Sequence, residues 1–154
     1  MNDTTFDQQK AHRRFAAACF NEAWNLLDKT DRTADDDLQL VRLVHASHWH
    51  WTQVEGATRE NFSIGYWQTA RVYAVLGQAD NARRYAAHCL EVSSGSDVEP
   101  FYLAYAHEAA ARAAALAGDV ETMRRHHDEA ARIAETLSDE ASRTQLQADL
   151  ETIG

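Results

Sequence analysis

The sequence predicts an all-α fold of about seven antiparallel helices. Apolar residues recur with the 3.6-residue period of an amphipathic helix along most of the chain, and no segment alternates as a strand would. The 154 residues include only 6 glycines and 1 proline, which suits long helices joined by short turns. With 45% hydrophobic and 25% charged residues, the composition is that of a globular protein, and we expect a single domain over residues 1–154.

The first expected hairpin covers about residues 5–56. Its first helix begins at about Thr5 and ends before the turn KTDRT. Thr33 is placed to cap the second helix, and Asp36 follows three residues later as an acidic first-turn residue. The second helix contains LQLVRLVHASHWHWTQV and ends near Gly56.

Two further hairpins are expected at about residues 58–92 and 99–137. The loop SSGSDVE separates them, and Pro100 then falls in the first turn of a helix, where its missing N–H costs nothing. An amphipathic helix at 138–152 follows, and we expect it to cap the stack of hairpins.

Two segments of the chain are alike, namely YWQTARVYAVLGQADNARRYAAHCLEV at 66–92 and HEAAARAAALAGDVETMRRHHDEAARI at 107–133. Each predicts a helix that ends in glycine, a tight turn with aspartate, and a second helix with a basic face. The two glycines, Gly77 and Gly118, are 41 residues apart. A supersecondary unit repeated at this spacing indicates a helical array.

The first of these segments resembles a tetratricopeptide repeat. Tyr66 and Tyr73 stand where that motif has aromatic residues, and Ala70 and Ala82 where it has small ones. Ala86 departs from the motif, which usually has an aromatic residue there. The resemblance implies a right-handed stack of helical hairpins. The chain is also similar to a group of small bacterial proteins with a histidine-tryptophan helix before an RVYAVLG helix, a likeness that implies no particular activity.

The tetratricopeptide resemblance also implies a peptide-binding groove, because the first helix of each hairpin lines the concave surface of such arrays. An aromatic ring beside an arginine can hold a peptide side chain or a carboxylate. A structural alternative stays open, in which two groove residues form a helix-stabilising ion pair and the tryptophan belongs to the core. The residues placed on this groove are Trp67, Arg71, Tyr105, Glu108 and Arg112.

The stretch HASHWHW at 45–51 concentrates three histidines and two tryptophans in the second helix. Since a helix advances about 100° per residue, His50 points almost opposite to His48, and one straight helix cannot direct all three histidines at one ion. Stacking of His45 on Trp49 favours an aromatic packing seam. The alternative is a small-ligand pocket, or a metal site completed by other helices, and no metal site is predicted because no ligand motif is present. The residues of the alternative pocket are His45, His48, Trp49 and His107.

The net charge of the chain and the absence of catalytic motifs limit the classes of partner and function that we expect. The net charge of −9 disfavours nucleic acid and anionic membranes as partners. Two widely spaced cysteines and a polar N-terminus, MNDTTFDQQK, predict a cytoplasmic protein. The sequence has no nucleophile elbow, phosphate loop or dinucleotide fingerprint, so we expect neither catalysis nor a cofactor. The expected function is a non-catalytic module that binds a protein or peptide partner, and a second copy of the chain is one candidate for that partner.

Overall fold

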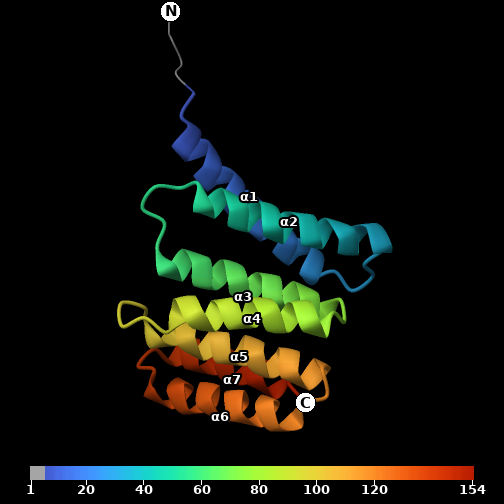
Figure 1. The fold of residues 1–154 in the computed structure, drawn as a ribbon, viewed down its shortest axis with the longest axis vertical. Coiled ribbons are helices and arrows are strands. Elements are labelled where there is room, and N and C mark those ends of the chain that lie inside the picture. Colours follow the sequence, from blue (N-terminus) through green and yellow to red (C-terminus); the bar gives the residue numbers. More distant parts are fainter. Residues whose placement is uncertain (1–5) are drawn as a thin grey trace, which may run out of the picture. The chain divides into compact units, whose positions relative to one another are not determined.

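A computed structural model describes residues 6–154, and this part of the chain is helical without strands (Figure 1). It confirms the predicted all-α class with seven helices. Their ends fall close to the predicted positions, although the expected helix start at about Thr5 lies outside the described residues. No described helix has the length and hydropathy needed to cross a membrane. The helices are α1 (Gln8–Leu27), α2 (Ala34–Thr52), α3 (Arg59–Val75), α4 (Ala79–Ser93), α5 (Pro100–Leu116), α6 (Val120–Thr136) and α7 (Glu140–Glu151).

The chain divides into two compact units, of which the first ends at Thr58 and the second spans Arg59–Gly154. The first unit is the α1–α2 hairpin. Its second helix begins with the predicted cap: the Thr33 hydroxyl accepts from the Asp36 N–H (3.2 Å), and the Asp36 carboxylate accepts from the Thr33 N–H (3.0 Å). This reciprocal capping box satisfies two backbone donors that the first turn of a helix leaves open. Across the hairpin, the buried Ser47 hydroxyl donates to the Ala16 carbonyl (2.8 Å).

In the second unit, α5 is the central helix, and it packs against α3, α4, α6 and α7. Its alanines make this possible, because a methyl side chain lets neighbouring helices approach closely on several sides. Ala111, Ala113 and Ala114 are all buried. The α7 helix lies against α5 and α6, where Leu146 and Leu150 enter the core.

The two hairpins of the second unit turn in the same way. Gly77 after α3 and Gly118 after α5 both adopt a left-handed backbone, with φ of 75° and 77°. At the second turn, the Asp119 N–H donates to the Ala114 carbonyl (2.9 Å) and the Gly118 N–H to the Ala115 carbonyl (3.0 Å). The first turn repeats this bond pair 41 residues earlier. This is the Schellman cap, which favours glycine because of its positive φ.

Candidate functional site

The five residues assigned to the groove come together in the second unit around the carboxylate of Glu108. Glu108 lies on α5 and its side chain has 0% exposure. One of its oxygens accepts from the Trp67 indole (2.8 Å), and the other accepts from Arg71 Nη2 (3.0 Å). Arg112, one helical turn further along α5, donates from Nε to that second oxygen (2.9 Å). The expected Glu108–Arg112 pair is therefore present, and α3 adds two more donors to it.

Tyr105 extends this network to α7. Its hydroxyl donates to the Asp149 carboxylate (2.7 Å), and its ring meets Trp67 edge-on with centroids 5.4 Å apart. Burial raises the pKa of the Tyr105 hydroxyl, and the hydrogen bond to Asp149 raises it further. The hydroxyl is therefore held in its neutral, donating form.

Arg112 also connects the network to the end of α7. Its Nη2 group donates to the Asp149 carbonyl (3.1 Å) and to the hydroxyl of Thr152 (2.7 Å). The sequence reasoning missed Asp149 and Thr152, because their helix was expected only to cap the stack. No local pattern marks these two residues, since their role depends on how α7 packs against α5.

The network contains more donors than acceptors. The two oxygens of Glu108 already receive the bonds from Trp67, Arg71 and Arg112. The Nε–H of Arg71 is buried without a partner among the described residues. Neither arginine uses its Nη1 group within the described part of the chain. The unused donors favour a ligand that brings acceptor oxygens.

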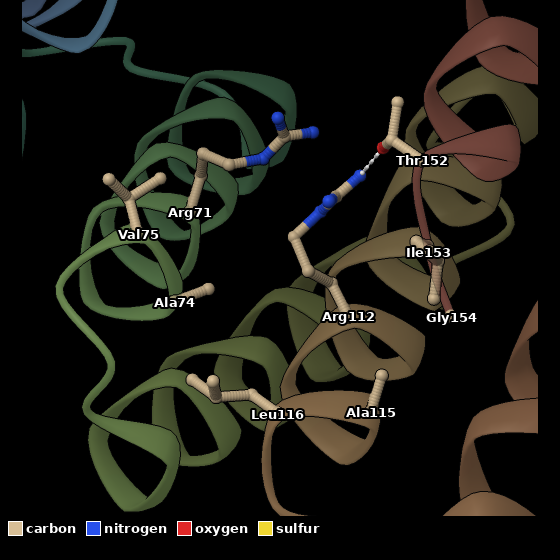
Figure 2. A pocket seen from close by; sticks show the side chains of 9 residues that line it. All are labelled: Arg71, Ala74, Val75, Arg112, Ala115, Leu116, Thr152, Ile153 and Gly154. Atoms are coloured by element: carbon tan, nitrogen blue, oxygen red, sulfur yellow. Dashed lines mark hydrogen bonds between the residues drawn. The ribbon is translucent and has the colours of Figure 1, made fainter. Parts of the chain in front are cut away.

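A hollow of about 260 Å³ lies beside this network, between α3, α5 and the residues after α7. Figure 2 shows the side chains of Arg71 and Arg112 reaching toward Thr152 at one end of the hollow, with Leu116 at the other. Val75 and Leu116 are each 43% exposed, which gives the hollow accessible aliphatic surface. The hollow is lined by Arg71, Ala74, Val75, Arg112, Ala115, Leu116, Thr152, Ile153 and Gly154.

The residues of the alternative pocket do not form one described cluster. In the first unit, Trp49 is 55% exposed and lies edge-on to the rings of His12 on α1 and of His50. The pKa of His45 in the same unit is lowered by burial. His107 belongs to the second unit, where its Nδ1 lies 2.9 Å from Nδ1 of His126 on α6. The described residues contain no group of three or more His, Cys, Asp or Glu side chains arranged to hold a metal ion.

The buried cysteine of α4 is unsuited to nucleophilic chemistry. Burial raises the pKa of the Cys89 thiol to about 11, so the reactive thiolate is scarce at neutral pH. Its sulfur donates to the Ser63 carbonyl (3.4 Å), and the hydroxyls of Ser63 and Ser93 are hydrogen-bonded to each other (2.7 Å). This cluster joins α3 to α4 and is a packing feature.

Comparisons of the chain with protein-family models, with curated proteins and with solved structures gave no match.

Proposed function

We propose that this protein is a non-catalytic interaction module that binds a segment of a protein partner in the hollow beside Glu108. The observation that carries the proposal is the pairing, in one hollow, of exposed aliphatic side chains with arginine Nη1 groups that bond to no residue of the part of the chain that the structure describes. A peptide supplies what such a surface lacks, because its backbone carbonyls accept hydrogen bonds and an apolar side chain covers Val75 and Leu116.

The size of the hollow favours one or two residues of a longer chain over a free cofactor. Pockets for drug-sized molecules occupy roughly 300–1,000 Å³, and this hollow has about 260 Å³. Its local charge is balanced, since Arg71 and Arg112 face Glu108 and Asp149. We therefore expect hydrogen bonding and apolar burial, more than net charge, to determine which segment binds.

The arrangement of the hairpins supports a tetratricopeptide-like version of this proposal. The α3–α4 and α5–α6 hairpins have the same glycine cap 41 residues apart, and the first helices of both hairpins contact each other. The five residues predicted for the groove lie on these two first helices, and two of them, Arg71 and Arg112, line the hollow. On this proposal the chain is a short helical-repeat module, and its partner is a protein or peptide.

Two exposed aliphatic residues near the same turn provide the test. Leu116 lines the hollow, whereas Val120 is 50% exposed and lies outside it. Peptides selected from a random displayed library on the wild-type protein should bind the Leu116→Glu variant at least about tenfold more weakly, a loss of about 1.4 kcal/mol. They should bind the Val120→Glu variant with unchanged affinity in a fluorescence-polarisation titration.

Both substitutions add one negative charge to an exposed position, so a nonspecific charge effect would weaken binding to both variants equally. Equal binding to all three proteins, or failure of the library to yield any binder, would refute the proposed groove.

A further inference from the structure

Two histidines face each other across the α5–α6 interface, and neither belongs to the proposed groove. Nδ1 of His107 lies 2.9 Å from Nδ1 of His126, with the ring planes inclined by 35°. Both rings are partly buried. One ring donates a proton to the other at this distance, so each has a nitrogen directed at its neighbour.

We propose that His107 and His126 form a binding site for a borderline divalent transition-metal ion such as Zn²⁺, with Glu129 as the third protein ligand. Two imidazole nitrogens bound to one such ion, at about 2.0–2.1 Å each, lie about 2.9–3.4 Å apart for bond angles between square and tetrahedral. The observed 2.9 Å is at the short end of this range, so the two ring nitrogens are already close enough to share one ion. Each ring then turns so that its Nδ1 lone pair points at the ion instead of at the other ring. The ring that carried the Nδ1 proton becomes its Nε2–H tautomer by proton exchange with water, and water completes the coordination of the ion.

The protonation of the pair suits a metal ion. Burial is the main cause that lowers the pKa of His107, and it is also the main cause for His126. Both rings are therefore neutral at pH 7, and neutral imidazole is the form that binds a metal.

Glu129 supplies the carboxylate. It lies one helical turn after His126 on α6, and its charge acts on His107 across the interface. In the structure its carboxylate accepts from Arg132 Nε (2.9 Å). The ion pair is exposed, so releasing the carboxylate from Arg132 costs little. A side-chain rotation of Glu129 would complete a set of three ligands that the described residues do not hold ready-made.

Two arginine side chains near the histidines would repel a bound cation. Arg125 lowers the pKa of His126, and Arg132 lowers that of His107. Two imidazoles alone would leave the ion's charge uncompensated against these arginines. The carboxylate of Glu129 is therefore essential to the site.

The first unit offers a matched control. His12 on α1 and His50 on α2 also approach with their Nδ1 atoms, at 2.8 Å. No acidic residue lies three or four positions before or after either histidine along the sequence. This pair tests whether two facing histidines can bind Zn²⁺ when no carboxylate lies one helical turn away.

The experiment is a calorimetric titration of the untagged 154-residue chain with Zn²⁺ after removal of metal by a chelator. The wild-type protein should bind one ion per chain. His126→Gln should abolish binding, Glu129→Gln should weaken it at least about tenfold, and His12→Gln should leave it unchanged.

A wild-type protein that binds no Zn²⁺ would overturn the proposal, as would binding that survives His126→Gln. Unchanged affinity in Glu129→Gln, or loss of the site in His12→Gln, would overturn the assigned ligands. If His126→Gln does not fold, imidazole ¹⁵N spectra of the wild-type protein decide the question. Addition of Zn²⁺ should shift the Nδ1 signals of His107 and His126 and leave those of His12 and His50 in place, and any other pattern contradicts the assignment.

Discussion

Glu108 is a carboxylate with no exposed surface, and its burial is tolerable only because three side chains donate hydrogen bonds to it. A buried charge without its partners is strongly destabilising. The same reasoning applies to Arg71 and Arg112, whose side chains are each 18% exposed. Each of these residues therefore depends on the others for its place in the fold.

Replacing Glu108 by glutamine should accordingly destabilise the protein. The Glu108→Gln side chain is neutral and leaves two largely buried arginines with only the more distant Asp149 carboxylate, 3.9 Å from Arg71, as a counter-ion. We therefore expect the free energy of unfolding to fall by about 3 kcal/mol or more. Urea unfolding followed by circular dichroism measures this change. The exposed Glu135 provides the control, and Glu135→Gln should alter the free energy of unfolding by less than about 0.5 kcal/mol. Equal effects of the two substitutions would contradict the assigned role of Glu108.

The structure shows a second role for the two arginines, which the sequence left open as an alternative for Arg112 and did not reveal for Arg71. From the sequence they are groove residues that contact a ligand, and Glu108 is a groove residue or a partner of Arg112 within one helix. In the structure both arginines also neutralise Glu108. Loss of binding after their replacement would not separate a lost contact from a damaged fold. Leu116, which makes no part of this network, is the better residue for a binding test.

At the scale of elements, the local signals in the sequence were sufficient to predict the helices. The apolar period located the seven helices of residues 6–154, Thr33 marked a capping box, and Pro100 marked a first turn. Gly77 and Gly118 marked the two turns with a left-handed backbone. Each of these signals lies within a few residues of the feature that it predicts.

Contacts between elements could not be predicted in the same way. Arg112 reaches Thr152 at the end of α7, and His107 meets His126 across α5 and α6. Such pairs depend on the rotation of each helix about its axis, which the apolar period fixes only coarsely. The proximity of the five predicted groove residues could be anticipated only from the resemblance to a repeat. That resemblance assigns them to the first helices of successive hairpins, and α3 and α5 contact each other.

The two glycine caps should respond alike to substitution. A Cβ atom at Gly77 or Gly118 would meet no other atom within 4 Å, so the positive φ is the only source of strain. We expect Gly77→Ala and Gly118→Ala each to lower the free energy of unfolding by about 1 kcal/mol, as measured by urea unfolding. The exposed neighbour Gln78 has a negative φ, and Gln78→Ala should cost less than about 0.5 kcal/mol. Unequal effects at the two glycines would show that the turns are not energetically equivalent.

At the scale of the whole molecule, the histidines should make stability depend on pH. Burial is the main cause that lowers the pKa of His45 and His50 in the first unit, and of His107 and His126 in the second. A histidine with a lowered pKa in the folded state is protonated more readily in the unfolded chain. As the pH falls below the unfolded value of about 6.5, the unfolded state binds more protons and the folded state loses stability.

Two other effects also make stability depend on pH. The aspartates act at a lower pH than the histidines, and the net charge acts in the opposite direction. Hydrogen bonds lower the pKa of Asp36, Asp119 and Asp139, and the stability that these carboxylates contribute is lost only as the pH falls further, below their unfolded values of about 4. The magnitude of the net charge, which is −9 at pH 7, decreases as the pH approaches the isoelectric point of about 5.3. This decrease reduces the repulsion between like charges in the folded chain. A drop in stability between pH 7.5 and 5.5 would therefore come from the histidines.

The double variant His107→Gln/His126→Gln separates the histidine effect from the change in overall charge. Because neither glutamine titrates, the variant should lose less stability than the wild-type protein when the pH falls from 7.5 to 5.5. Urea midpoints at the two pH values measure the difference, with a chelator present so that no bound metal contributes. An equal loss in both proteins would mean that this buried pair does not link protonation to unfolding. A smaller loss in the variant would show that protonation of His107 and His126 at the α5–α6 interface destabilises the folded state. These are the same two rings that the proposed metal site requires in their neutral form.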